Sequence, residues 1–184
     1  MSMSVVDVYD NVLESHVAEF IEINMKDLKW EYDYHSKKGE PNKHWHIFCG
    51  HDDEELTDNS FEWLQPIWET AKYKYNFQEK YGLTDYVRVY MNAHTHGIEP
   101  HWHIDDGDFT MIYYPRMDWK TEWGGGTMVE GTLGINEYVE YQGNRLMVFQ
   151  AQLKHQAQPV SRECYHLRTC VVFKCSADKG MTIH

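Results

Sequence analysis

From Tyr86 onward the sequence is a succession of short segments in which polar and apolar residues alternate, with turns between them. This texture predicts β-strands, because the side chains of a strand point alternately to its two faces. No helical periodicity separates the segments, so the crossover helices of a parallel sheet are missing and the pattern predicts a sandwich or barrel. We expect strands at Tyr86–Asn92, Phe109–Tyr114, Gly126–Val129, Glu137–Tyr141, Arg145–Gln150 and Leu167–Cys175.

The N-terminal part of the chain predicts a helix followed by a hairpin. Apolar residues recur at steps of three and four within Val6–Phe20, which indicates an amphipathic helix over residues 5–25. Trp30–Tyr34 and His44–Cys49 alternate on either side of a turn at Lys37–Asn42. Two alternating segments joined in this way predict a β-hairpin.

An acidic segment and a second helix follow the hairpin. His51–Glu55 is expected to be a solvated loop. Residues 66–81 are expected to be helical, because Pro66 is tolerated in a first turn and Gly82 favours a helix end.

These segments together predict one domain of 184 residues, mainly β, with a double-stranded β-helix (jelly roll) braced by N-terminal helices. Residues 1–82 would form the helical and hairpin support, and residues 83–176 the jelly-roll core.

Composition excludes several classes of protein. The net charge is −12 and Lys and Arg are not clustered, so a nucleic-acid partner is not expected. Aromatic residues make up 15% of the chain, which argues against low-complexity disorder. No signal peptide or membrane-spanning run is present, so we expect a cytoplasmic protein without a membrane partner. The oligomeric state stays open.

Cysteine usage agrees with a reducing compartment. The four cysteines contain no Cys-x-x-Cys pair and no dense disulfide framework. We expect reduced thiols.

A His-x-Asp pair, His103 and Asp105, lies on a short polar loop. Residues two apart on an extended chain point the same way, so the pair can supply two ligands to one metal ion. A facial iron site needs two imidazoles and one carboxylate, with open positions opposite them. His155 is the candidate for the third ligand.

The chain has other histidines for which we expect no metal role. His44-x-His46 and His94-x-His96 have ligand-like spacing but no third group in a recognisable context, so we interpret them as loop or strand-face residues. Nor do His16, on a helix, and His184, at the terminus, have a carboxylate in a ligand-like pattern.

Five motifs in order resemble the 2-oxoglutarate- and Fe(II)-dependent oxygenases, in particular the small prolyl-4-hydroxylase-like branch. The resemblance extends from Tyr86 to Cys175 and does not include the first 80 residues. The motifs are His103-Ile104-Asp105, Ile112–Trp119, Gly125-Gly126-Thr127, His155 with Pro159-Val160, and Arg168–Phe173.

The resemblance implies roles for individual residues. His103, Asp105 and His155 would bind Fe(II), and Arg168 would bind the distal carboxylate of 2-oxoglutarate. A buried arginine on an apolar strand is costly without an anionic partner, and a carboxylate matches its guanidinium fork. Tyr113 would add a hydroxyl to the same carboxylate.

Other positions leave alternatives. Tyr90 would reach the co-substrate or the substrate, although Tyr90 and Tyr113 could also be ordinary aromatic core. His101 is an alternative first ligand one strand period before His103, which we prefer because its spacing to Asp105 matches the motif. Arg162 could replace Arg168, but it lies in a polar turn where exposure is expected.

The implied activity is hydroxylation of a C–H bond with release of succinate and CO2, using Fe(II), 2-oxoglutarate and O2, with ascorbate as an optional cofactor. The substrate would be a peptide or protein, with peptidyl proline one candidate, or a small molecule. The alternative is a non-catalytic, cupin-like metal- or ligand-binding jelly roll, which gives no reason for Arg168. A zinc hydrolase would want a His-Glu-x-x-His motif, which is absent.

Overall fold

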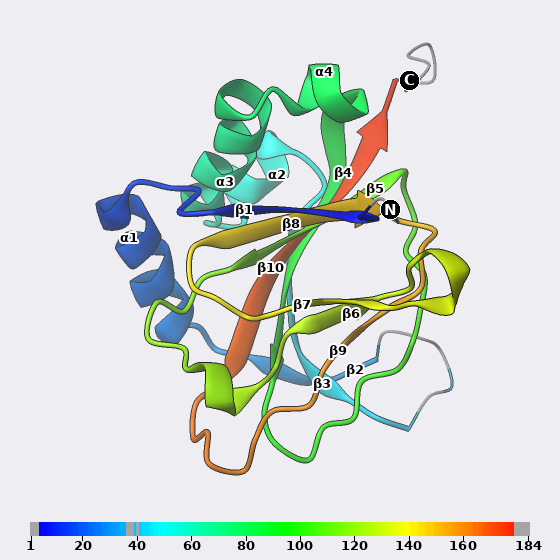
Figure 1. The fold of residues 1–184 in the computed structure, drawn as a ribbon. Coiled ribbons are helices and arrows are strands. Elements are labelled where there is room, and N and C mark those ends of the chain that lie inside the picture. Colours follow the sequence, from blue (N-terminus) through cyan, green and yellow to red (C-terminus); the bar gives the residue numbers. More distant parts are fainter. Residues whose placement is uncertain (1–3, 36–38, 40, 179–184) are drawn as a thin grey trace.

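The computed structural model describes residues 4–35, 39 and 41–178. Among these residues, a seven-stranded antiparallel sheet of order β1-β8-β5-β10-β4-β3-β2 faces a three-stranded sheet of order β7-β6-β9. Figure 1 shows the helices on one side of the large sheet and the small sheet on the other. This arrangement confirms the predicted jelly roll. The strands are β1 (Val6–Asp10), β2 (Glu31–Tyr34), β3 (His44–Gly50), β4 (Leu83–His94), β5 (Phe109–Tyr114), β6 (Thr127–Val129), β7 (Glu137–Val139), β8 (Arg145–Gln150), β9 (His155–Ala157) and β10 (Arg168–Ala177).

The large sheet separates two hydrophobic cores. Val171 and Phe173 of β10 belong to the core beneath the helices. Cys170 and Val172 of the same strand belong to the core beneath the small sheet. The alternation of side chains along a strand therefore decides which residues can reach the space between the two sheets.

Four α-helices, with the turns at Glu62–Leu64 and Thr70–Lys74, pack on the outer face of the large sheet in the described part of the chain. The α-helix nearest the N-terminus buries Ala18, Ile21 and Met25 against the sheet. The helices are α1 (Ser15–Lys26), α2 (Asp53–Asp58), α3 (Gln65–Glu69) and α4 (Phe77–Tyr81), with 3-10 turns at Glu62–Leu64, Thr121–Trp123 and Thr132–Gly134 and a π-helical turn at Thr70–Lys74.

The helix predicted over residues 5–25 is corrected in the part before Ser15. Residues Val6–Asp10 form β1, which pairs antiparallel with β8, and the helix begins at Ser15. Phe20, which belongs to the predicted apolar periodicity, is 55% exposed. Apolar residues in a short segment fit more than one period, and the unpaired edge of β8 supplies the hydrogen bonds that favour a strand.

The acidic loop expected at residues 51–55 is largely helix α2. Asp52 caps this helix, because its side chain accepts a hydrogen bond from the Glu55 backbone N–H at 2.9 Å. The acidic residues that predicted solvation lie in the first turn, where they interact favourably with the helix dipole.

The helix predicted over residues 66–81 is interrupted rather than continuous. Asn76 adopts a left-handed conformation, with φ of 52°, and separates the π-helical turn from α4. Gly82 ends α4 with φ of 71°, as its position predicted.

The predicted strand positions are largely confirmed. The bounds of β5 and β8 are those expected from the sequence, and β2 pairs with β3 as a hairpin. Strand β9 was not predicted, because three residues are too few for a visible alternation. The turn expected at residues 37–42 lies partly outside the described residues, and His184 lies wholly outside them.

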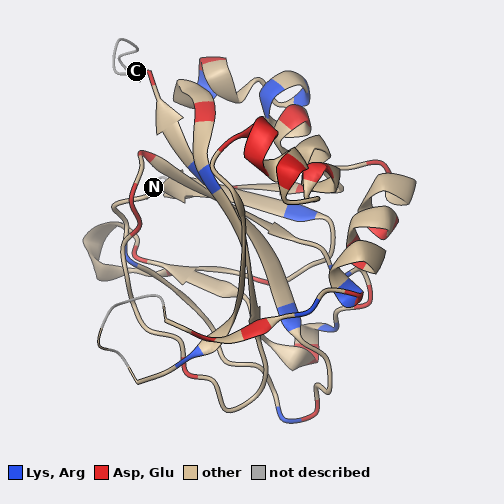
Figure 2. Ribbon diagram, turned by 180° about the vertical axis from the view of Figure 1, so that it is seen from behind, with Lys and Arg blue, Asp and Glu red and all other residues tan. Residues whose placement is uncertain are grey.

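The described structure also shows where the charged residues and the cysteines lie. Figure 2 shows acidic positions gathered on α2 and neighbouring turns, with Lys and Arg scattered between acidic residues. All four cysteines are free and buried, as predicted for reduced thiols. None of the helices in the described ranges has the length and apolarity needed to cross a bilayer.

Asn144 ties the N-terminal segment to the sheet. Its amide accepts a hydrogen bond from Leu13 N at 2.9 Å and donates to Leu13 O at 2.8 Å, and its backbone has φ of 60°. We predict that Asn144→Ala lowers the free energy of unfolding by about 2–4 kcal/mol, because two buried backbone groups lose their partner. Urea denaturation would measure this. The exposed Asn136→Ala should be near neutral, and equal stability of the two variants would contradict the assigned role.

Candidate metal centre

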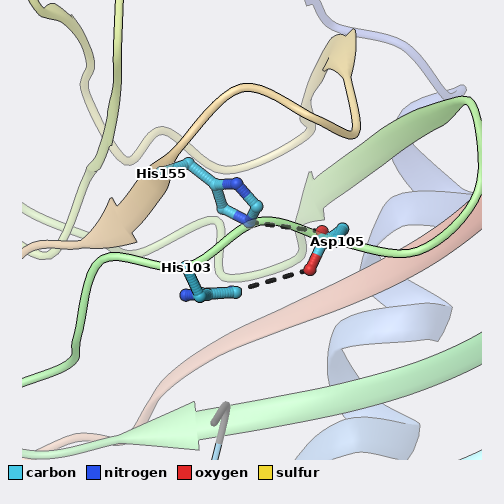
Figure 3. A group of neighbouring side chains, drawn as sticks. All are labelled: His103, Asp105 and His155. Atoms are coloured by element: carbon cyan, nitrogen blue, oxygen red, sulfur yellow. Dashed lines mark ion pairs between the residues drawn. The ribbon is translucent and has the colours of Figure 1, made fainter.

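Three side chains that are separated in the sequence converge between the two sheets. Each of His103, Asp105 and His155 offers a ligand atom, and these atoms all lie within 4.8 Å of one another. His155 Nε2 lies 3.2 Å from Asp105 Oδ2, and His103 Nε2 lies 3.7 Å from Asp105 Oδ1. Figure 3 shows the two imidazoles directed at the carboxylate from different segments. The structure therefore brings together the three residues that the sequence predicted as ligands.

Backbone hydrogen bonds hold this group in place. His103 and His155 form an isolated antiparallel bridge, with N–O distances of 3.1 and 2.9 Å. Asp105 N donates to Ala151 O at 2.9 Å. The loop that carries His103 and Asp105 is thus fixed to the segment around β9, although some fifty residues separate them in the chain.

The two histidines present the same nitrogen to the carboxylate. Nδ1 of His103 donates to the carbonyl of His101 at 2.9 Å, and Nδ1 of His155 donates to the carbonyl of Leu153 at 3.0 Å. A carbonyl can only accept, so Nδ1 carries the proton and Nε2 keeps a free lone pair. Hydrogen bonds from the other ring nitrogen to a carbonyl orient histidines that bind metals.

Burial also keeps both imidazoles neutral. It lowers the pKa of His103 to about 4, with a further contribution from His155, and it lowers the pKa of His155 to about 4. Neutral imidazole is the form that binds a metal ion. Two neutral Nε2 atoms and one carboxylate on one side of an open space fit the facial arrangement of non-haem Fe(II).

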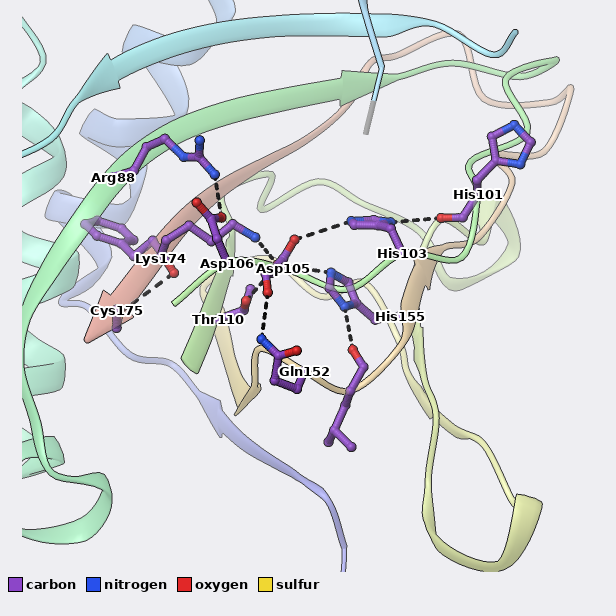
Figure 4. Close-up of polar contacts among 12 residues, drawn as sticks. Arg88, His101, His103, Asp105, Asp106, Thr110, Gln152, His155, Lys174 and Cys175 are labelled. Atoms are coloured by element: carbon purple, nitrogen blue, oxygen red, sulfur yellow. Dashed lines mark hydrogen bonds and ion pairs between the residues drawn. The ribbon is translucent and has the colours of Figure 1, made fainter. Parts of the chain in front are cut away.

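The carboxylate of Asp105 has two further partners (Figure 4). Thr110 Oγ1 donates to Asp105 Oδ2 at 2.7 Å, and Lys174 Nζ contacts the same oxygen. Lys174 is 1% exposed. Burial, with a smaller contribution from the Arg88 guanidinium, lowers the pKa of Lys174 to about 6. The direct contact with the Asp105 carboxylate acts in the opposite direction and favours the ammonium form, so Lys174 and Asp105 form a buried ion pair.

Lys174 and Thr110 were not predicted from the sequence. A signal for Lys174 was present, because it lies six residues after Arg168 on an otherwise apolar strand and so shares its face by the period of two. Thr110 gave no signal, since a threonine in a strand is ordinary.

Arg168 lines the same cavity as the three candidate ligands. It is 1% exposed, and its guanidinium bonds Gly125 O at 2.6 Å and Thr127 Oγ1 at 3.3 Å. Within the described residues no carboxylate forms an ion pair with it. A buried guanidinium without an anion is costly, so the cavity fits a ligand that brings a carboxylate to Arg168.

The position predicted for Tyr113 is corrected. Tyr113 points into the core beneath the helices, and its hydroxyl donates to Asn144 Oδ1 at 3.2 Å. Its neighbour Tyr114 faces the cavity side, where its hydroxyl lies 2.6 Å from Thr127 Oγ1 and its ring lies 5.4 Å from the Arg168 guanidinium. The alternation of β5 allows only one of the two tyrosines on each face, and the sequence left that parity open.

The alternative metal ligand and the alternative arginine, His101 and Arg162, do not line the cavity. Tyr90 lines the cavity together with His103 and Arg168. His101 instead lies near Asn42, with Nε2 at 3.1 Å from the Asn42 amide nitrogen. Arg162 is exposed, as expected for a turn.

The histidine pairs and the glycine run also have defined places. His44 and His46 lie on β3, and His94 ends β4 and lines the cavity, whereas His96 is exposed in a turn. Gly125 has φ of 75°, and a Cβ there would lie 3.1 Å from the Arg168 side chain. This glycine therefore permits the close approach of backbone and guanidinium.

Comparisons with known proteins identify the fold. No protein-family model and no curated protein sequence is similar to this chain. A prolyl-4-hydroxylase from Pseudomonas putida is similar in structure, with a TM-score of 0.70 and 12% identity over 95% of this chain and 93% of that one. An oxidoreductase of the 2OG-Fe(II) oxygenase family from Burkholderia pseudomallei has a TM-score of 0.71 and 14% identity over 94% of this chain and 85% of that one.

A third similar structure is a prolyl hydroxylase from Trichoplax adhaerens in complex with a hypoxia inducible factor peptide fragment. It has a TM-score of 0.66 and 14% identity over 94% of this chain and 84% of that one. The chain thus has the fold of the 2OG-Fe(II) oxygenases. Prolyl-4-hydroxylases are among its structural neighbours, which confirms the resemblance seen in the sequence at the level of the fold.

The buried pair of Lys174 and Asp105 generates a stability prediction. In the presence of a chelator, Lys174→Met should lower the free energy of unfolding by about 3–5 kcal/mol, because it leaves a buried carboxylate without its cation. Adding Asp105→Asn to Lys174→Met should recover much of this loss. Urea denaturation measures both, with Lys154→Met as a control that removes only the exposed, 3.9 Å contact with Glu130. If Lys174→Met is as neutral as the control, the pair does not stabilise the site.

Proposed function

We propose that this protein is an Fe(II)- and 2-oxoglutarate-dependent dioxygenase that hydroxylates a C–H bond and releases succinate and CO2. The observation that carries the proposal is one cavity lined by two complementary groups. The His103–Asp105–His155 group and the buried guanidinium of Arg168 both line it. A 2-oxo diacid has a metal-chelating keto acid at one end and a carboxylate at the other, so it suits both.

We propose that the chain's own residues divide the work as follows. His103, Asp105 and His155 would hold Fe(II), and bound there the iron would supply the oxidative chemistry with O2. Arg168 would bind the distal carboxylate of 2-oxoglutarate. Thr110 and Lys174 would hold one oxygen of Asp105 and so orient the other.

We propose that Tyr114, rather than Tyr113, supplies the tyrosine hydroxyl that supports the co-substrate. Tyr114 would support the co-substrate through Thr127, which bonds Arg168 and lines the cavity. Tyr90 would form part of the cavity wall between the metal and the substrate. Ascorbate stays an optional reductant.

A neighbouring groove supports access by a second substrate. It shares Tyr90, Asn92, His103 and Asp105 with the cavity and is otherwise lined by Tyr34, Arg88, Ile104 and Asp106. The similar protein from Trichoplax adhaerens binds a peptide, which favours a peptide or protein substrate, with peptidyl proline the first to test. A small molecule is the second candidate.

We further propose that the chain acts as a single catalytic domain, with residues 83–176 as the core and 1–82 as support. The rival function is a cupin-like metal-binding protein without turnover. It would account for the fold and the three ligands, but it would not require a buried arginine without an anion in the same cavity.

The metal ligands give the first test of this function. Anaerobic addition of Fe(II) and 2-oxoglutarate should produce a weak visible charge-transfer band, and oxygen should then yield succinate. We predict that His103→Ala, Asp105→Ala and His155→Ala each abolish the band and succinate release in folded protein, because a three-ligand site cannot lose one ligand and keep its geometry. His101→Ala should retain both. Loss in His101→Ala but not in His103→Ala would contradict the ligand set.

The arginine gives the second test. Arg168→Gln should weaken 2-oxoglutarate binding by at least about tenfold, because truncating one partner of a buried charged pair costs about 2–5 kcal/mol. Tyr114→Phe should reduce the binding free energy of 2-oxoglutarate by less, about 0.5–1.5 kcal/mol, because only one neutral hydroxyl is removed.

Calorimetric titration of the Mn(II)-loaded protein measures these affinities, with Tyr113→Phe as the matched control on the opposite face of β5. Wild-type affinity is expected for the control. A larger effect of Tyr113→Phe than of Tyr114→Phe would reverse the assignment of the two tyrosines. Wild-type affinity in Arg168→Gln would refute the co-substrate site.

A further inference from the structure

His94 is a buried histidine that is not one of the three candidate metal ligands, and the backbone pairing of β4 does not involve its imidazole. It is 5% exposed, and its Nδ1 has no hydrogen-bond partner among the residues that the structure describes. Buried polar atoms nearly always have a partner in the protein, in ordered water or in a ligand. The unpaired nitrogen therefore calls for a partner other than the described residues, such as a bound ligand.

The ladder of β4 and β10 places His94 beside Arg168. The two residues are direct partners in the antiparallel register, so their side chains leave the same face of the sheet. Both line the cavity that contains His103. The ring of His44 packs edge-on against His94, with centroids 4.9 Å apart, and helps to fix its orientation.

We propose that His94 is a further binding residue for the 2-oxo acid, donating a hydrogen bond from Nδ1 to the co-substrate beside the Arg168 guanidinium. This inference rests on the proposed function and adds to it a residue that the sequence motifs do not contain.

The chemistry of a neutral imidazole suits this role. Burial, and next the nearby Arg168 guanidinium, hold the pKa of His94 well below its usual value, so the ring is uncharged. A neutral imidazole has one N–H and one lone pair, and an anionic partner selects the tautomer with the proton on the nitrogen that faces it. His94 thus adds a donor to the site without adding a second buried cation next to Arg168.

Binding of 2-oxoglutarate to the full-length protein loaded with Zn(II) or Mn(II) tests the inference. His94→Leu removes both ring nitrogens, so calorimetry should show an affinity for 2-oxoglutarate about tenfold weaker. His94→Gln keeps an amide donor and should lie between His94→Leu and the unaltered protein. His96→Leu is the matched control, since His96 is exposed two residues further on, and it should bind like the unaltered protein.

A spectroscopic measurement separates direct contact from a structural role. In long-range proton–nitrogen NMR spectra of histidine-labelled, Zn(II)-loaded protein, 2-oxoglutarate should move one histidine fully to the Nδ1–H tautomer. That change should be absent from His94→Gln. This measurement also decides the question if His94→Leu does not fold.

The results of these experiments distinguish a failure of the proposed function from a failure of the role of His94. If the unaltered protein does not bind 2-oxoglutarate, the proposed function fails and this inference fails with it. If the unaltered protein binds and both His94 variants bind equally well, only the role of His94 is overturned. Equal weakening in His94→Leu and His96→Leu, or no tautomer change, would also overturn it.

Discussion

The alternation of side chains along β10 is the constraint on which the rest of the structure depends. Its odd-numbered residues, such as Val171 and Phe173, pack beneath the helices, and its even-numbered residues face the small sheet. A strand that pairs with β4 on one side and β5 on the other cannot slip by one residue without exchanging these faces. The same register that fills both cores therefore delivers Arg168 and Lys174 to the cavity.

Two buried cations on one strand would be untenable without compensation, and the structure compensates them differently. Lys174 contacts the carboxylate of Asp105. Among the described residues Arg168 has only neutral acceptors, the Gly125 carbonyl, the Thr127 hydroxyl and the Cys170 sulfur, together with the rings of Tyr114 and Tyr141. The candidate metal centre therefore already has a cation paired with its carboxylate, whereas the part of the cavity next to Arg168 calls for an anion.

Much of the site could be predicted from the sequence because its signals are local. The His-x-Asp spacing of His103 and Asp105 needs only an extended loop, and an arginine on an apolar strand is conspicuous wherever the strand lies. Tyr113 was assigned to the wrong face because the residues of β5 are buried on both sides. A strand buried on both faces has no polar side to reveal its parity. The helix predicted over Val6–Phe20 was wrong for its first residues, which form β1. The pairing of β1 with β8 is a contact between distant segments, and no local pattern reveals it.

The sequence by itself determined the class of fold, the positions of most strands and the residue types of the candidate site. These follow from alternation, turn residues and the chemistry of histidine, carboxylate and guanidinium, all of which act over a few residues. Only the tertiary structure decided that Tyr114 rather than Tyr113 lies on the cavity side of the large sheet, that Lys174 and Thr110 both contact Asp105, and that His94 lies opposite Arg168. Each of these depends on the register between strands far apart in the chain, and register is fixed by packing both faces of the sheet at once.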